Sequence, residues 1–315
     1  MIKFFLKRLV SFFLALVAAS VLIFLLIEIL PGDPALSILG LEADPKAVEN
    51  LRAELGLDRS VQTRYFSWFL GILHGDFGSS WTYGVPAAEL ILPRLLVTIP
   101  LALFAIMISI AIAVPLGLFA AQNHRRSGDV GVMIFGQLGL AIPNFWLGLL
   151  LIMFFGLTLK WFPVGGFPGW QDGLGPAIAS LTLPAFSLGV VQAAILARII
   201  RAALLEVSRD DFVRTARAKG FSRRRVLVSH VFRNALVPSS TVIGLQFSYL
   251  IAGTVIIENV FYLPGLGRLV LQAIANRDLI LVENVVMLLV ALVIFVNFCV
   301  DIANRFIDPR LGEET

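Results

Sequence analysis

Charged residues are scarce in this sequence. They make up only 15% of its 315 residues, whereas hydrophobic residues make up 58%. A soluble globular domain carries about 25% charged residues, so this balance excludes an ordinary soluble protein. The composition instead predicts an integral membrane protein, whose outer surface meets lipid.

Cysteine and lysine are also rare, and each absence excludes a class of function. The one cysteine, Cys299, leaves no internal disulfide to be formed. None of the five lysines follows a glycine, so the glycine-rich phosphate loop with its lysine is missing. The chain therefore lacks the usual means of binding and hydrolysing ATP. The lysines are Lys3, Lys7, Lys46, Lys160 and Lys219.

Histidine is equally rare, and its placement argues against a metal site. His74, His124 and His230 lie far apart in the sequence and do not form a metal-ligand spacing. His74 is a candidate for contact with an external metal ion, but a polar contact is the commoner role of a loop histidine. Neither a nucleophile elbow nor aromatic-basic interleaving is present. The sequence predicts no catalytic residue, metal or cofactor in this chain, and no nucleic-acid partner.

Long uncharged segments are abundant, and six of them contain 17 or more residues. A helix needs about 20 apolar residues to cross a hydrocarbon core roughly 30 Å thick. The last segment is slightly short, but Asp301 at its edge can extend its carboxylate to the interface. We predict an all-α integral membrane fold with six transmembrane helices, a multi-pass protein in a lipid bilayer. The segments are Leu9–Ile27, Leu95–Asn123, Val130–Leu159, Gly173–Ala197, Asn234–Ile257 and Asn284–Val300.

The first uncharged segment has a second interpretation, a cleaved signal peptide. A basic leader precedes it, and Val17-Ala18-Ala19 weakly matches a cleavage site. However, the apolar stretch continues to Leu30, which is longer than the core of a usual signal peptide. We therefore predict a retained signal-anchor helix.

The distribution of Lys and Arg predicts the orientation in the membrane. If the N-terminus is inside, the inner segments hold 17 of the 25 basic residues. Cytoplasmic loops of membrane proteins carry an excess of Lys and Arg, so both termini are expected to be cytoplasmic. This asymmetry also explains the basic isoelectric point without a nucleic-acid partner.

The predicted spans divide the chain into four parts. Residues 1–30 form the first transmembrane helix, residues 31–94 an outer region, residues 95–304 a five-helix core with an inner loop at 206–235, and residues 305–315 a tail. In the outer region Asp44 and Pro45 begin a helix that Gly56 ends, and a second helix covers Ser60–Leu73. This region is either a structural cap or a gate or docking shelf for an external partner.

Two shorter outer loops complete the predicted topology. Lys160–Asp172 is rich in Gly and Pro, which excludes a regular helix. Asn259–Glu283 is the other, and Pro264-Gly265-Leu266-Gly267 within it predicts a turn.

The most informative segment is the inner loop, which is densely charged. Ser208 is expected to cap a helix that carries acid in its first turn and base in its last, and that Gly220 ends. Phe212, Val213 and Ala216 fall on one side and form a small apolar face. Ser222 is expected to cap a second helix leading into the fifth span, with Pro238 at the start of that span. Lipid anchoring alone would explain the basic residues but not the caps and the apolar face.

Polar residues within the spans are candidates for a translocation path, because they are costly unless they face protein or water. We select Gln137, Asn144, Gln192 and Gln246, with Gln246 the leading candidate. Ordinary hydrogen bonding between helices is the alternative for each of them. Pro143 is expected to break the third span near Asn144.

Three acidic residues of the outer side are candidate gate contacts. They are Glu258 at the outer end of the fifth span, and Asp33 and Asp76 in the outer region. No span contains a central charge, which argues against an ion relay within the chain.

The inner loop also contains sequence motifs that resemble those of a known family. Arg214-Thr215-Ala216, Gly220 and Val237-Pro238 resemble the cytoplasmic signature of ABC importer permeases, and the longer run around them is similar to the dipeptide/oligopeptide/nickel subfamily. The general signature has Glu-Ala-Ala where this chain has Arg-Thr-Ala, and its spacing to the proline is shorter; both departures are expected in the peptide subfamily. Further matches are Leu30–Pro34, Gly75–Gly78, Ile142–Gly148, Pro264–Arg268 and Asp308–Arg310.

The resemblance implies the permease fold of type I ABC importers, in a bacterial inner membrane, with a periplasmic helical cap between helices 1 and 2. It implies a homologous second permease subunit, two ATPase subunits that bind ATP and Mg, and a periplasmic solute-binding protein. It also implies that the inner loop holds a coupling helix that docks in a groove on the ATPase. The residues implied are Asp210, Asp211, Phe212, Arg214, Thr215, Ala216, Arg217, Lys219 and Gly220.

The sequence leaves the substrate and two rival functions open. Peptides are the expected cargo, with nickel chelates, opines and oligosaccharides as alternatives within the same architecture. A self-sufficient secondary transporter or channel would need coupling charges inside the spans, which are not evident. A membrane scaffold without transport would leave the polar residues within the spans unexplained.

Overall fold

The chain is described here by a computed structural model covering residues 2–29, 33–40 and 42–307. Within these ranges the side chains of residues 2–4, 37, 236–241, 243, 306 and 307 are not described. The motif residues Pro31 and Gly32 and the Asp308–Arg310 motif lie outside the described residues, as do most of the predicted tail and the side chains of Val237 and Pro238.

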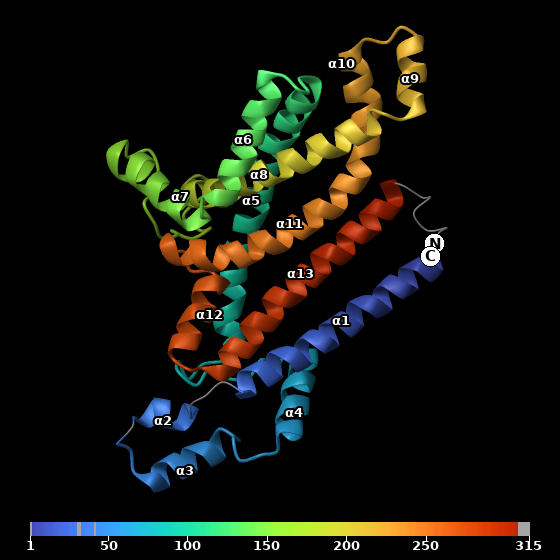
Figure 1. Ribbon diagram of the computed structural model, residues 1–315. Coiled ribbons are helices and arrows are strands. Elements are labelled where there is room, and N and C mark those ends of the chain that lie inside the picture. Colours follow the sequence, from blue (N-terminus) through green and yellow to red (C-terminus); the bar gives the residue numbers. More distant parts are fainter. Residues whose placement is uncertain (1, 30–32, 41, 308–315) are drawn as a thin grey trace. The chain divides into compact units, whose positions relative to one another are not determined.

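The described residues form helices connected by loops (Figure 1), and their sole β feature is an isolated bridge between Ser79 and Pro86. Two of the helices, η1 and η2, are π-helical. The elements are α1 (Ile2–Ile29), α2 (Pro34–Leu39), α3 (Pro45–Glu54), α4 (Val61–His74), α5 (Ala87–Gln122), α6 (Ser127–Ala141), α7 (Asn144–Leu151), η1 (Ile152–Thr158), α8 (Leu174–Val207), α9 (Asp211–Ala218), α10 (Arg223–Val226), η2 (Leu227–Val231), α11 (Phe232–Val260), α12 (Leu266–Ala275) and α13 (Leu279–Ile307).

The chain divides into two compact units, which we describe separately. Unit 1 comprises Met1–Thr98 and Pro264–Phe295, and unit 2 comprises Ile99–Leu263 and Val296–Thr315. Helices α5 and α13 therefore contribute residues to both units.

Among the described residues, four helices are long and apolar enough to cross a membrane: α1, α5, α8 and α13. The pair of α6 with α7 and η1 makes a fifth candidate if the two arms are one span. Between 22% and 50% of the residues in the most apolar windows of the four helices are buried, so much of their apolar surface is left to face lipid. Helix α11, 29 residues long, covers the fifth predicted segment.

The third predicted span is broken, as expected, at Pro143. The two arms meet at 98°. Ile142 is extended because a residue before proline avoids the helical region, and Pro143 supplies no N–H to the helical ladder. Asn144 therefore becomes the first residue of a new helix, α7.

In unit 1 the predicted caps of the outer region are confirmed. The Asp44 carboxylate accepts a hydrogen bond from the Lys46 N–H at 3.1 Å and begins α3, and Gly56 follows the helix with a φ of 68°. Ser60 caps α4, whose C-cap Gly75 is left-handed. These caps show that the ends of the short helices follow from local sequence.

The predicted turn at Pro264–Gly267 is wrong in part, because α12 begins there at Leu266. The N–H of Leu266 donates to the Thr98 hydroxyl at 2.8 Å, and Leu266 is fully buried. This hydrogen bond satisfies one of the free N–H groups at the helix start. Further along, buried Asp278 accepts from the N–H groups of Thr82 and Leu281, at 3.1 and 3.2 Å.

In unit 2 glycines allow helices to approach closely. A Cβ built on Gly139 of α6 would lie 2.2 Å from the Ala194 Cβ of α8. A Cβ on Gly189 of α8 would lie 2.7 Å from the Ala105 carbonyl oxygen of α5. Small residues at helix contacts are the usual packing device of membrane helices, which gain no hydrophobic drive from associating in lipid.

This contact yields a matched test within one helix. Gly139→Ala is expected to lower the free energy of unfolding by about 1–3 kcal/mol, because the added methyl overpacks the α6–α8 contact. Gly131→Ala is also on α6, but no atom of the described residues lies within 4 Å of its added Cβ, so it is expected to be neutral or slightly stabilising. Thermal unfolding of the purified chain in detergent measures both; equal melting temperatures would contradict the close contact.

Candidate functional site

The inner loop folds as the short helix α9 after the long helix α8. The sequence predicts that Ser208 caps α9, and this is wrong. Ser208 is instead the C-cap of α8, and its hydroxyl donates to the Leu204 carbonyl at 2.6 Å. Asp210 takes the N-cap position of α9 without a side-chain capping bond. The correction shifts the helix start by two residues and leaves the carboxylate of Asp211 in the first turn, where the helix dipole favours it.

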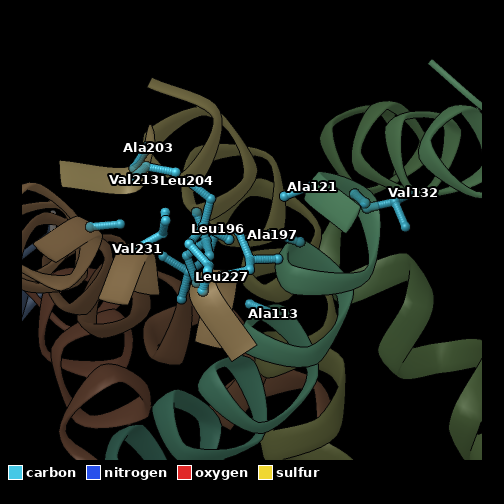
Figure 2. Close-up of a cluster of buried hydrophobic side chains, with 14 of the residues drawn as sticks. Ala113, Ala121, Val132, Leu196, Ala197, Ala203, Leu204, Val213, Leu227 and Val231 are labelled. Atoms are coloured by element: carbon cyan, nitrogen blue, oxygen red, sulfur yellow. The ribbon is translucent and has the colours of Figure 1, made fainter. Parts of the chain in front are cut away.

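One face of α9 is buried against the rest of unit 2. Val213 is 1% exposed and Ala216 is 8% exposed. Both belong to a hydrophobic cluster (Figure 2), which we call the α9 seat. Its other members are Ala113, Ala120, Ala121, Val132, Ala193, Leu196, Ala197, Ile200, Ala203, Leu204, Val226, Leu227, Val231 and Ala235.

The three residues of the predicted apolar face of α9 have different surroundings. Val213 and Ala216 are covered by the chain itself, so they are not available to a partner, whereas Phe212 is 39% exposed. The outward side of α9 is otherwise polar. On it the Arg214 guanidinium lies 3.4 Å from the Asp211 carboxylate, and the Thr215 hydroxyl donates to the Asp211 carbonyl at 3.0 Å. Arg217 and Lys219 are exposed as well.

The end of α9 is as predicted. Gly220 has a φ of 85°, a left-handed conformation that glycine adopts without Cβ strain. Ser222 then caps α10 by accepting from the Arg225 N–H at 3.4 Å, and α10 continues through η2 into α11. The seat and this sharp turn hold α9 as a short rigid element at the end of two long helices.

The four candidate path residues have different surroundings. Gln192 and Gln246 are buried, and the side-chain oxygen of each has no hydrogen-bond partner among the described residues. Gln137 is exposed, and Asn144 is half-buried at the start of α7. An unpartnered buried amide oxygen is uncommon and calls for a partner such as water or solute.

The candidate gate residues are fixed by local contacts. Asp33 caps α2 and accepts from the Arg52 guanidinium, with Nε at 2.7 Å, and this hydrogen bond holds the pKa of Asp33 below its usual value. Asp76 is exposed and accepts from the Gly78 N–H at 2.9 Å. Glu258 of α11 is fully buried. His74, the candidate metal contact, ends α4, and its Nδ1 lies 2.8 Å from the Leu70 carbonyl oxygen.

Comparison with known proteins identifies the family. Residues 113–313 match the family described as "Binding-protein-dependent transport system inner membrane component", and residues 1–102 match the N-terminal family of the same systems.

The chain belongs to this family. The permease is 43% identical over 306 residues to a Brucella suis biovar 1 (strain 1330) protein assigned to a peptide transport system as its permease, covering 97% of this chain and 98% of the relative. It is 35% identical over 311 residues to the glutathione transport system permease protein GsiC of Salmonella choleraesuis (strain SC-B67), covering 99% of each.

Solved structures agree on the fold. The MetNI methionine ABC transporter in an inward-facing conformation matches with a TM-score of 0.56 and 19% identity, covering 70% of this chain and 96% of that chain. The fold is that of an ABC importer permease. The chain is therefore a multi-pass inner-membrane permease component of an ABC transport complex, and the ATPase is a separate subunit. These parts of the sequence interpretation are confirmed.

The sequence interpretation missed a buried ionic network near the seat. Asp129 at the start of α6 is 4% exposed and accepts from the Arg201 guanidinium of α8, with Nη2 at 2.7 Å. It also accepts from the Arg125 N–H at 3.0 Å, and His124 Nδ1 lies 3.2 Å away. Arg125 has a φ of 64°, so the carboxylate fixes a strained turn between α5 and α6. The position of Asp129 directly after a predicted inner turn could have indicated a role in fixing that turn. No nearby residue indicated that Arg201 is its partner.

Proposed function

We propose that this permease moves peptides from the periplasm to the cytoplasm, using ATP and Mg bound by two partner ATPase subunits. The relatives support the class of cargo, because one is assigned to peptides and another to glutathione, which is itself a tripeptide. A homologous second permease and a periplasmic solute-binding protein complete the assembly. Nickel chelates, opines and oligosaccharides remain the alternative cargoes.

The observation that carries the mechanism is the division of α9 into a buried and an exposed side. Val213 and Ala216 belong to the same buried cluster as residues of α8, α10 and η2, and the exposed side presents Phe212 and the charged residues. A helix anchored in this way transmits a pull as a rigid body to the two long helices that flank it. We therefore assign α9, from Asp210 to Gly220, as the coupling helix.

The proposed topology has six spans, with both termini in the cytoplasm and a periplasmic cap formed by α2, α3 and α4. The five candidate spans and the long helix α11 support that count, and the excess of Lys and Arg on the inner segments supports the orientation. In this topology α9 lies on the cytoplasmic side, where the ATPase is.

The proposed path uses the buried glutamines. Gln192 of α8 and Gln246 of α11 each leave an amide oxygen free within unit 2, and Gly253 of α11 lies against Asn144 at the break of the third span. Neutral amides of this kind favour a passage of broad selectivity, with recognition left to the binding protein. Asp33, Asp76 and Glu258 remain our candidates for the periplasmic gate. The rival to an ATP-driven importer is a carrier driven by an ion gradient.

The docking surface can be tested by co-purification. Phe212→Ala is expected to reduce the amount of ATPase that co-purifies with the permease about tenfold, since a partly exposed aromatic side chain at an interface is a typical hot spot. Phe66→Ala is the matched control, because Phe66 is an exposed phenylalanine of α4 in unit 1. The permease alone is expected to hydrolyse no ATP. Full ATPase recovery with Phe212→Ala would refute the assignment of α9, and peptide uptake without any ATPase subunit would favour the rival carrier.

A further inference from the structure

A basic cavity lies beside the coupling helix in unit 2. Its volume is about 310 Å³, and its lining comes from the α5–α6 turn, the end of α8, α9, α10 and η2. Four arginines line it: Arg125, Arg209, Arg217 and Arg223. We call it the arginine cavity.

Among the described residues, no carboxylate lines the arginine cavity. Asp129, next to the α5–α6 turn, is already bound by the guanidinium of Arg201. Asp211 of α9 is exposed and pairs with Arg214, which is not part of the lining. Within the described part of the chain, none of the four lining arginines forms an ion pair. Four guanidinium groups thus line one cavity, and the nearest carboxylate that the structure shows, that of Asp129, lies behind the lining residue His124, 3.2 Å from its Nδ1, and is bound by Arg201.

The position of the cavity ties this charge to α9. Arg217 belongs to α9 and Arg223 to α10, whereas Arg125 comes from the turn that Asp129 fixes. Like charges around one cavity repel, and an anion in the cavity converts that repulsion into attraction. Such an anion would link Arg217 of α9 to Arg125 of the α5–α6 turn, and this link would add to the apolar contacts of the seat.

We infer that the arginine cavity binds a phosphate-bearing anion that stabilises the seated position of α9. Guanidinium groups match phosphate oxygens in geometry as well as charge, and they are weakly hydrated. Leu205, Val226, Leu227 and Val231 line the same cavity and suit the hydrocarbon carbons that adjoin a phospholipid headgroup. The effect of the anion on transport rests on the proposed coupling role of α9, whereas the binding of the anion does not.

Two sources supply such a group, an anionic phospholipid and free inorganic phosphate, and two titrations separate them. The full chain in neutral detergent is titrated with phosphatidylglycerol, with phosphatidylcholine as the zwitterionic reference of zero net charge, and retained lipid is counted by native mass spectrometry. Inorganic phosphate is titrated separately by calorimetry. Binding of phosphatidylglycerol alone identifies the headgroup, and binding of both identifies the phosphate group itself; either result supports the inference.

The variants locate the binding. Arg217→Gln and Arg223→Gln are each expected to weaken it at least tenfold, and Arg217→Lys, which keeps the charge, is expected to weaken it less. Arg224→Gln is the matched control, because Arg224 neighbours Arg223 on α10 but does not line the cavity. Two results would overturn the inference: neither probe binds, or Arg224→Gln weakens binding as much as Arg223→Gln does. Binding is measured without the ATPase, so its failure is distinct from failure of the coupling role, which Phe212→Ala tests.

Discussion

Uptake is expected to stop when Ala216 is replaced by aspartate. The methyl group of Ala216 is 8% exposed and belongs to the buried α9 seat. An aspartate side chain overfills this packed position and loses hydration, which we expect to cost about 3 kcal/mol and to lower the ratio of seated to unseated helix by a factor on the order of 100. In the proposed mechanism, helix α9 no longer transmits motion to the long helices that flank it once it has left its seat. The measurement is uptake of a labelled dipeptide by cells that express the whole transporter.

The same substitution two residues later serves as the control. Ala218 belongs to the same helix but is exposed, so Ala218→Asp adds an equal charge without entering the seat. Its melting temperature is expected to match that of the unaltered permease, whereas that of Ala216→Asp falls by several degrees. Both variants are expected to reach the membrane in normal amounts. Normal uptake by Ala216→Asp would refute the coupling role of α9.

Where backbone chemistry is local, the sequence was sufficient to predict the structure. The caps at Asp44 and Ser222, the left-handed Gly220 and the break at Pro143 each depend on a side chain or φ preference within a few residues. These are the features that define α9 and its exit, so most of the candidate site was predictable as secondary structure.

Where the partner is distant in sequence, prediction failed. The local Pro-Gly signal predicts a turn, but helix α12 begins at Leu266, whose N–H donates to the Thr98 hydroxyl, 168 positions away. Ser208 was predicted to begin a helix, but α8 extends far enough to make it a C-cap. The periodicity of α9 gives one apolar face, and only packing shows that Val213 and Ala216 meet the seat while Phe212 remains outside.

Asp129 and Arg201 form a buried ion pair although they lie 72 positions apart in the sequence, so local patterns could not predict it. Asp129→Asn is expected to lower the free energy of unfolding by about 3 kcal/mol, because it leaves the mostly buried guanidinium of Arg201 without its counter-charge. It also replaces one of the two acceptor oxygens with an NH2 donor, so the side chain can no longer accept from both the Arg125 N–H and the two guanidinium nitrogens, and the α5–α6 turn is expected to loosen. Denaturant unfolding of the purified permease in mixed micelles measures the change.

Asp211→Asn provides the comparison for this second experiment. Asp211 also pairs with an arginine, but its side chain is 93% exposed and that of Arg214 is 79% exposed, so the pair is worth at most about 1 kcal/mol. The double variant Asp129→Asn/Arg201→Gln removes both charges and is expected to recover part of the loss, because the cost arises from the unpaired cation rather than from the missing bond. If Asp129→Asn and Asp211→Asn destabilise the permease equally, the network does not fix the turn, and Arg125 needs another explanation for its strained backbone.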